Sequence, residues 1–134
     1  MYLLDTNVCI YIMKNSFPAL TQRLLDENPE DVAISAITLF ELEYGAGKSR
    51  WGNQTRDKLY TFLAPFNILP FDDRDAVCAG CLRALLDKQG LPIGPYDIQI
   101  AAQAYARNLT VVTRNTKEFS RIPNLKVEDW IKLS

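Results

Sequence analysis

The chain has 134 residues, of which 48% are hydrophobic and 23% are charged. This length is sufficient for one domain with a substantial core, and the aromatic content of 10% argues against intrinsic disorder. The formal net charge of −1 excludes a uniformly basic nucleic-acid coat, although local basic patches can still bind phosphate. The sequence contains no histidine, which excludes a Ser-His-Asp triad and a histidine-ligated zinc site.

Targeting and membrane-spanning patterns are missing from the sequence. Its apolar runs are far shorter than the roughly 18 residues of a spanning helix, and its first residues lack the basic and apolar regions of a signal peptide. The cysteine count of 3 is odd, which favours reduced thiols over a disulfide framework. We therefore expect a soluble, cytoplasmic protein that forms a single domain over residues 1–134.

Short apolar runs have the composition of buried parallel strands. Each is only a few residues long and is rich in β-branched or other apolar side chains, as strands covered on both faces are. We predict strands at Tyr2–Leu4, Val32–Ile34, Phe66–Leu69 and Leu109–Thr113.

Longer stretches with helical spacing lie between these runs, at Asn7–Lys14, Pro18–Glu27, Ile37–Gly47, Gln54–Leu63, Asp75–Gln89 and Tyr96–Arg107. The last of them has a regular apolar stripe for burial, formed by Ile98, Ala101, Ala102, Tyr105 and Ala106. This alternation of strands and helices predicts an α/β fold, a three-layer α/β/α domain with a mainly parallel central sheet. Ligands of such sheets bind at the carboxyl ends of the strands.

Several polar side chains fall at positions that this fold would gather at one edge. Asp5 directly follows the first strand, and Asn115 lies just beyond the fourth. Glu41 lies one turn into a helix, and Asp97 begins another. Carboxylates in a partly buried site repel one another, and a divalent cation relieves that repulsion. Because these ligands are hard oxygens, Mg²⁺ is the expected cation and Mn²⁺ the alternative.

Each of these positions also has a purely structural interpretation. Asp5 can cap the helix that follows it, and Asp97 can be a first-turn acid that the helix dipole favours. Asn115 and Glu118 have the spacing of a capping box. Taken alone, these positions leave a metal site and ordinary helix capping both open.

Other acidic residues are ambiguous in the same way. Glu41 and Glu43 are two positions apart on one predicted helix, so they point to different faces, and periodicity does not decide which one turns inward. The acidic turn formed by Asp72, Asp73 and Asp75 precedes a helix, and we expect it to be solvated and to cap that helix.

Four segments, in this order and spacing, resemble the motifs of PIN-domain ribonucleases. They are Leu3-Leu4-Asp5-Thr6-Asn7, Ser35-Ala36-Ile37-Thr38-Leu39-Phe40-Glu41-Leu42, Gly94-Pro95-Tyr96-Asp97 and Val112-Thr113-Arg114-Asn115-Thr116-Lys117-Glu118-Phe119. The resemblance extends to Val127-Glu128-Asp129-Trp130, so it covers essentially the whole chain. Within that family the sequence is most similar to the VapC-type toxins of toxin–antitoxin pairs, in the group that cuts initiator tRNA.

This resemblance implies a metal-dependent endoribonuclease in which Asp5, Glu41 and Asp97 hold Mg²⁺ or Mn²⁺. It therefore selects Glu41 over Glu43. Asn115 would be a further catalytic residue, at a position where many PIN domains carry a fourth acid. An amide brings no charge, which makes tight binding of a second metal less favourable. Around these ligands, three side chains are expected to orient ligands or water: Thr6, Thr113 and Glu118.

RNA binding by a chain of this net charge requires local positive surface. The expected RNA-binding residues are Lys48, Arg50, Trp51, Arg56, Arg114 and Lys117. The tryptophan is either a stacking platform for an unpaired base or a buried side chain between helices. Arg114 and Lys117 either contact backbone phosphate beside the predicted active edge or belong to a solvated helix face.

The resemblance also implies a substrate and partners. The substrate would be tRNA, cut once in the anticodon stem-loop of initiator tRNA, which stops translation. A cognate VapB-type antitoxin would inhibit the enzyme by placing a basic residue among the carboxylates. A homodimer and a toxin–antitoxin hetero-oligomer would be the assemblies. The residues alone leave two alternatives, another metal-dependent phosphoesterase and a non-catalytic protein-binding module.

Overall fold

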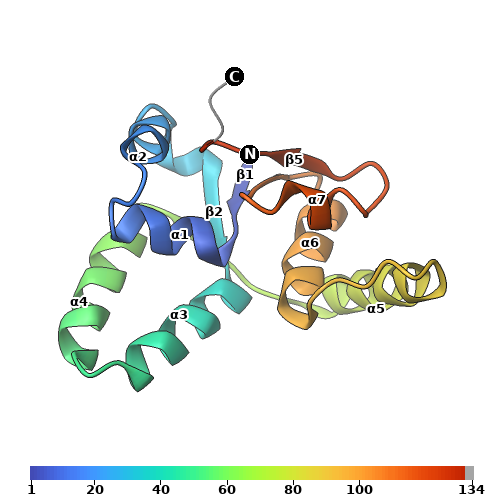
Figure 1. The fold of residues 1–134 in the computed structure, drawn as a ribbon, viewed down its shortest axis with the longest axis horizontal. Helices are drawn as coiled ribbons and strands as arrows, with labels where there is room; N and C mark the ends of the chain where they lie inside the picture. Colours follow the sequence, from blue (N-terminus) through green and yellow to red (C-terminus); the bar gives the residue numbers. More distant parts are fainter. Residues whose placement is uncertain (132–134) are drawn as a thin grey trace.

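The computed structural model describes residues 1–131, and in this part of the chain a parallel sheet lies between two layers of helices (Figure 1). The sheet has 5 strands in the order β3-β2-β1-β4-β5. The strands are β1 (Tyr2–Leu4), β2 (Val32–Ser35), β3 (Asn67–Leu69), β4 (Thr110–Val112) and β5 (Lys126–Glu128). The α/β/α fold class and the parallel sheet expected from the sequence are therefore confirmed.

Helices occupy most of the remaining chain. They are α1 (Thr6–Met13), α2 (Pro18–Leu25), α3 (Ala36–Lys48), α4 (Gly52–Leu63), α5 (Asp73–Lys88), α6 (Pro95–Arg107) and α7 (Thr116–Phe119), with a 3₁₀ turn η1 (Pro29–Asp31). In Figure 1, α3 and α4 form a pair at the lower left, whereas α5 extends to the right alongside α6. Within residues 1–131, no helix is long and apolar enough to cross a membrane.

The central strand β1 contributes to both apolar layers, because successive side chains of a strand point to opposite faces. Leu3 pairs in register with Ala33 and Val111, and it packs into the layer beneath α5 and α6. Leu4 points the other way, into the layer that α1, α2 and α4 cover. Both leucines are fully buried, so β1 is fixed from both sides and its carboxyl end is a rigid position.

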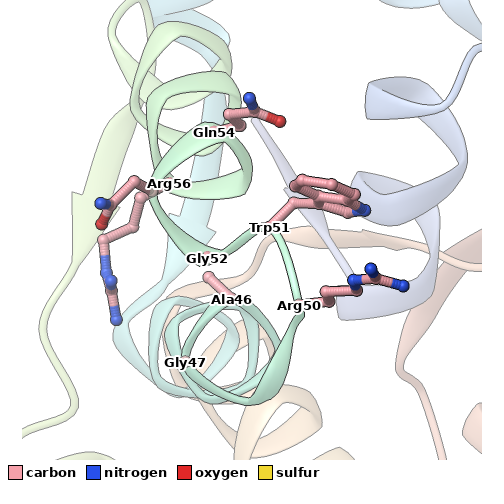
Figure 2. Close-up of a pocket in the computed structure, with 8 residues that line it drawn as sticks. Ala46, Gly47, Arg50, Trp51, Gly52, Gln54 and Arg56 are labelled. Carbon is pink, nitrogen blue, oxygen red and sulfur yellow. The ribbon is translucent and has the colours of Figure 1, made fainter.

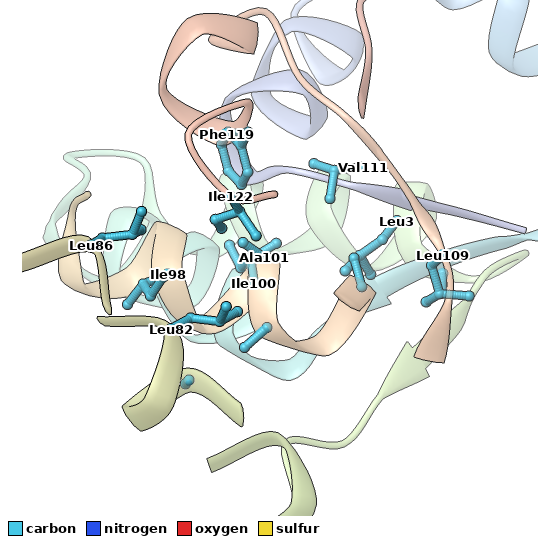
Figure 3. Packing of buried hydrophobic residues seen from close by; sticks show 14 residues of the cluster. Leu3, Leu82, Leu86, Ile98, Ile100, Ala101, Leu109, Val111, Phe119 and Ile122 are labelled. Carbon is cyan, nitrogen blue, oxygen red and sulfur yellow. The ribbon is translucent and has the colours of Figure 1, made fainter. Parts of the chain in front are cut away.

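The α5 and α6 layer holds the first core (Figure 3). Leu82 and Leu86 of α5 face Ile98 and Ile100 of α6, and Phe119 closes the cluster from α7. On the opposite face, the second core contains Val8, Leu20, Ile34, Leu59 and Trp130. The buried apolar residues of the three inner strands, β1, β2 and β4, belong to these two cores, whereas β3 and β5 form the edges of the sheet.

Helix α6 is buried more completely than its apolar stripe predicts. Ile98, Ala101 and Ala102 are buried as expected, but Tyr105 is exposed and Gln103 is fully buried. The cause is that α6 packs against α5 as well as against the sheet. A helix covered on two sides no longer shows a single apolar face.

The predicted strands and long helices are present, with ends that differ by one or two residues. Three short elements were not predicted: β5, α7 and η1. The prediction for the acidic turn before α5 is only partly right. Asp72 and Asp75 do form a capping box, but Asp75 is fully buried rather than solvated, and its Oδ2 atom lies 2.8 Å from Nη2 of Arg107.

Candidate active site

Asp5 lies at the carboxyl end of the central strand β1. Its backbone N–H donates to the carbonyl of Val112 at 3.0 Å, which extends the sheet pairing by one residue. Its side chain is nearly buried and accepts two hydrogen bonds, from the backbone N–H of Val8 at 2.8 Å and from the hydroxyl of Thr113 at 2.6 Å. Asp5 therefore caps α1, and the same bonds hold its carboxylate rigidly at the edge of the sheet.

Glu41 reaches the same edge from α3. The hydroxyl of Thr6 donates to Oε1 of Glu41 at 2.8 Å and lies 3.1 Å from the hydroxyl of Thr38. Glu43 points elsewhere, since its Oε1 atom lies 3.3 Å from Nε of Arg56 on α4. The geometry thus places Glu41, and not Glu43, beside the end of β1.

Asp97 lies in the first turn of α6, where Glu118 joins it from α7. Oε1 of Glu118 accepts a hydrogen bond from the backbone N–H of Gly94 at 2.9 Å. The side-chain amide of Asn115 donates to Oε2 of Glu118, and in the described part of the chain it does not cap α7. The capping-box interpretation of Asn115 and Glu118 is therefore wrong, because Glu118 bonds the backbone of Gly94 and the side chain of Asn115 bonds Glu118.

The carboxylates are close enough to affect one another electrostatically. Burial, together with nearby acids, raises the pKa of Asp97 from its ordinary value of 3.8 to about 6. Burial has the largest effect on that pKa, and among the charges that of Glu118 acts most strongly, followed by those of Asp5 and Glu41. Burial also raises the pKa of Asp5, and the charge of Glu41 acts in the same direction. Negative charge is thus concentrated at one edge of the sheet.

This concentration of charge fits a hard divalent cation. Among residues 1–131, no three acidic, cysteine or histidine side chains stand in an arrangement ready to enclose a metal. The donors that are present are carboxylate, hydroxyl and amide oxygens, which Mg²⁺ and Mn²⁺ prefer. The raised pKa values of Asp5 and Asp97 come from burial and from repulsion between the acids, and a bound cation would offset both. The residues of the site therefore suit Mg²⁺ chemically.

The sequence matches the PIN domain family over residues 2–125. This chain belongs to the PIN domain family, in its VapC group. It is 41% identical over 129 residues to the tRNA(fMet)-specific endonuclease VapC of Salmonella typhimurium, covering 96% of this chain and 97% of that protein. It is 44% identical over 135 residues to ribonuclease VapC2 of Rickettsia felis, and this alignment covers 98% of this chain and 99% of that protein.

The backbone of this PIN domain agrees with the same group. The crystal structure of DNA-bound VapBC from Salmonella typhimurium superposes with a TM-score of 0.91. That alignment has 40% sequence identity and covers 96% of this chain and 97% of the other. The similarity in backbone therefore extends over almost the whole PIN domain.

Two of the expected RNA-binding residues of this PIN domain line pockets that also contain one of the acids. Arg114 lines a pocket of about 320 Å³ together with Asp5, Tyr11 and Asn115. Its guanidinium carbon lies 5.1 Å from the ring centre of Phe17. Lys48 lines a different pocket, which it shares with Thr6 and Glu41. Lys117 is exposed on α7.

The remaining three lie farther away, at the connection between α3 and α4 (Figure 2). Arg50 and Trp51 point to one side of that connection and Arg56 to the other. The guanidinium carbon of Arg50 lies 5.3 Å from the ring centre of Trp51. Because Trp51 is 60% exposed, the interpretation of this tryptophan as a buried side chain is wrong.

Three aromatic residues beside the acids were not among the residues predicted to act in the site. Phe40, Tyr44 and Tyr96 line the pocket that contains Glu41 and Lys48. The available signal was helical spacing, since Tyr44 lies three residues after Glu41 and so shares its face of α3. Phe40 and Tyr96 each precede an acid directly in sequence, but their exposure could only be learned from the fold.

Proposed function

We propose that this PIN domain is a metal-dependent endoribonuclease that cuts tRNA, with initiator tRNA as its substrate and inhibition of translation as the result. The observation that carries the proposal is the gathering of Asp5, Glu41, Asp97 and Glu118 at the carboxyl edge of the sheet, where burial and the charges of the other three acids raise the pKa of Asp97 to about 6. Support for the substrate comes from the Salmonella typhimurium relative, which is named for tRNA(fMet).

In the proposed site, Asp5, Glu41 and Asp97 hold Mg²⁺, or Mn²⁺ in its place. A cation bound there would supply positive charge that favours ionisation of a nearby water and stabilises the charge developing on a phosphodiester. Asp5 is suited to this role because its two hydrogen bonds fix the carboxylate while each oxygen retains a free lone pair.

Three neighbouring side chains would keep these ligands in position. Thr6 holds Glu41 through its hydroxyl. Thr113 donates to Asp5 and accepts a hydrogen bond from the backbone N–H of Asn115 at 2.9 Å, so the acid and the amide are joined through one hydroxyl. Glu118 fixes the side chain of Asn115 and the start of α6. Asn115 itself would orient water or a ligand oxygen next to the scissile phosphate.

The RNA backbone would be bound by the cations around this edge. Arg114 and Lys48 lie on either side of the acids and are placed to contact the phosphates next to the cut. The expected contacts farther along the RNA come from Arg50, Trp51, Arg56 and Lys117. Of these, Arg56 is the weakest candidate, because it already pairs with Glu43.

The test is to incubate the purified, antitoxin-free protein with total bacterial tRNA. Reactions contain Mg²⁺, Mn²⁺ or EDTA, and a parallel set uses Asp97→Asn. We expect a single cut, lost with EDTA and reduced at least a thousandfold in the variant. Glu43→Gln is the matched control, since it removes an acid of the same helix α3 that faces Arg56 instead of the site, and it should cut normally.

Other results would point to different functions. Cleavage of DNA or of small phosphate esters, but of no RNA, would indicate another metal-dependent phosphoesterase. Absence of any cleavage, together with a melting temperature that does not respond to Mn²⁺, would indicate a non-catalytic binding module. Full activity of Asp97→Asn would contradict the assignment of the metal ligands.

We further propose that a VapB-type antitoxin neutralises this enzyme and that the chain forms a homodimer within the toxin–antitoxin complex. The support is the Salmonella typhimurium structure, which is a VapBC assembly. Co-expression with the protein encoded by the neighbouring gene should give a complex that purifies as one species and has no nuclease activity. Light scattering of the isolated chain should give twice its mass of 15.2 kDa.

A further inference from the structure

A pocket of about 550 Å³ opens directly from the acidic edge and runs along α3. Glu41 and Thr6 lie at one end and Lys48 at the other, while Phe40, Tyr44 and Tyr96 form its aromatic walls. We call the group Phe40, Tyr44, Lys48 and Tyr96 the ring pocket. It is separate from the pocket around Trp51, which lies beyond the end of α3.

The rings of this pocket are unusually exposed for side chains of their size. Phe40 is 53% exposed, Tyr44 62% and Tyr96 43%. Contiguous apolar surface of this kind marks a binding surface more often than scattered single residues do. The ring centres of Phe40 and Tyr96 lie 5.5 Å apart, so these two residues form one surface that spans α3 and α6.

Two of the rings are next to proposed metal ligands in the sequence. Phe40 immediately precedes Glu41, and Tyr96 immediately precedes Asp97. A nucleic acid whose phosphodiester lies at the two carboxylates must therefore place an adjoining nucleoside against these rings or against the Arg114 side of the site. The Arg114 side also has two rings, Tyr11 and Phe17, but both are less exposed than the three rings of the ring pocket.

The order of chemical groups along α3 matches the order of groups along a nucleotide chain. Glu41, Tyr44 and Lys48 follow one another at helical spacing and span about 10 Å along the helix axis. The ammonium nitrogen of Lys48 lies 4.8 Å from the ring centre of Tyr44. Acid, ring and cation thus stand in a row where a scissile phosphate, a base and the next phosphate would lie.

From this arrangement we propose that the ring pocket binds an unpaired nucleobase next to the cut, stacked on Tyr44 and Phe40, with the adjoining phosphate on Lys48. Base–aromatic stacking accepts any base, because every base has a π-face. The pocket would therefore require the RNA at the cut to be single-stranded without selecting its sequence. This inference rests on the proposed nuclease function and specifies how its substrate is recognised.

The test uses an RNA hairpin with the anticodon stem-loop of initiator tRNA, whose single-stranded loop carries 2-aminopurine, a base whose fluorescence is quenched by stacking. Asp97→Asn protein serves as the background, so that the RNA is bound but not cut. Tyr44→Leu should weaken binding roughly 5- to 150-fold, the range expected for the loss of one base stack, and should abolish the quench. Tyr44→Phe, which retains the ring, should bind within about twofold.

A second variant fills the pocket without removing a ring. Gly45 lines the pocket, and a Cβ built there would meet no described atom within 4 Å. Leucine is a better helix former than glycine, so Gly45→Leu should fold at least as well. We expect this variant to bind the hairpin as weakly as Tyr44→Leu does, because its side chain occupies the volume of the base.

Several results would overturn the inference. One is unchanged quenching and affinity in both Tyr44→Leu and Gly45→Leu. Another is loss of RNA binding that occurs only together with a change of mass in light scattering, since the rings would then be an interface between copies of this chain. If instead the unmodified protein cuts no RNA while Tyr44→Leu still loses hairpin binding, the proposed nuclease function fails and the base pocket stands.

Discussion

At the residue scale, the site combines structural and chemical tasks in the same side chains. Asp5 caps α1 and is also the acid at the end of the central strand. Both interpretations of its sequence position are thus compatible, because a carboxylate has lone pairs enough for a cap and a cation. The consequence is a loss of stability in the metal-free protein, since burial and the neighbouring charges raise the pKa of Asp5 and of Asp97.

The raised pKa of Asp97 predicts that the stability of the metal-free protein depends on pH. The pKa of Asp97 is about 6 in the folded protein against 3.8 ordinarily, so its contribution to stability is complete below pH 3.8 and is lost as the pH rises to about 6. Asp97→Asn should therefore stabilise the metal-free protein above pH 6, by about 1–2 kcal/mol once partial solvent screening is allowed for. Thermal unfolding at pH 7.5 and pH 4, in EDTA, measures the difference.

The same experiment with Mn²⁺ should reverse the order of stability. The cation stabilises only a protein that binds it in the folded state, so the unmodified chain should gain and Asp97→Asn should gain far less. Glu43→Gln is again the control, because its acid faces Arg56 and should show neither effect. An equal melting-temperature difference between Asp97→Asn and the unmodified protein at both pH values would contradict the prediction.

At the scale of elements, one buried side chain joins the helices that carry two of the acids. Gln103 of α6 is fully buried, and its amide donates to the carbonyls of Leu69 at 3.3 Å and Pro70 at 3.1 Å. Its oxygen accepts from the hydroxyl of Ser35. Ser35 in turn caps α3, accepting from the backbone N–H of Ile37 at 2.9 Å. Helices α6 and α3 are thereby held in register at the end of β3.

Replacing this residue should therefore destabilise the fold. Gln103→Leu leaves the buried hydroxyl of Ser35 and two carbonyls without their partner, and we expect a loss of about 2–4 kcal/mol in the free energy of unfolding. Gln99→Leu is the matched control one turn earlier on α6, where the side-chain amide donates to the carbonyl of Pro95 in its own helix. Urea unfolding should show a change within about 0.5 kcal/mol for that control. Equal losses in both variants would argue against the hydrogen-bonded junction.

Helix α5 offers a second contrast, between two glycines. Gly80 lies in the interior of α5, where a Cβ would meet no atom of the described chain within 4 Å. Gly80→Ala should therefore stabilise the protein by about 0.5–1 kcal/mol. Gly90 follows the end of α5 with a φ of +69°, a conformation that alanine adopts only with strain. Gly90→Ala should be destabilising by a similar amount, and urea unfolding of both variants checks the opposite signs.

The elements that could be predicted from sequence are those with an apolar pattern of their own. β1, β2, β4 and the long helices have such patterns. β5 is an edge strand with only Val127 between two charged residues, and α7 is a single turn, so neither shows a period. Gln103 and Asp75 were missed because a polar residue is expected at the surface, whereas each is buried here with bonded partners.

The residues of the candidate site could be predicted only in part from sequence patterns. The acids Asp5 and Asp97 followed from strand and helix ends, but the choice of Glu41 over Glu43 required the family resemblance. Its physical basis, the hydroxyl of Thr6 beside Glu41 and the guanidinium of Arg56 beside Glu43, joins residues more than thirty positions apart or on separate helices. Contacts of that kind are set by packing and have no signature in local spacing.

At the scale of the whole molecule, function depends on how a nearly neutral chain distributes its charge. The net charge is −1, so the protein has little long-range attraction for RNA. Negative charge is concentrated at the carboxyl edge of the sheet, with Lys48 and Arg114 on either side of it. Under the proposed function, the phosphate contacts come from these two cations and, farther along the RNA, from Arg50 and Lys117, and stacking supplies much of the remaining affinity.

This distribution predicts a weak dependence of RNA affinity on salt. Each phosphate contact in a single-stranded region contributes about −0.7 to the slope of log K against log salt, so two to four contacts give a slope of about −1.4 to −3. Lys48→Gln should reduce the slope by about 0.7. Lys88→Gln, at the far end of α5, should leave it unchanged.

Fluorescence titrations of the hairpin with the Asp97→Asn protein, between 50 and 300 mM KCl, measure this slope. A slope steeper than about −4 would mean that the RNA contacts many more cations than the acidic edge offers. Equal changes in the two lysine variants would mean that attraction is spread over the whole surface. The expected result is a shallow slope that changes in Lys48→Gln but not in Lys88→Gln. That result would locate RNA binding at the edge where the strands end.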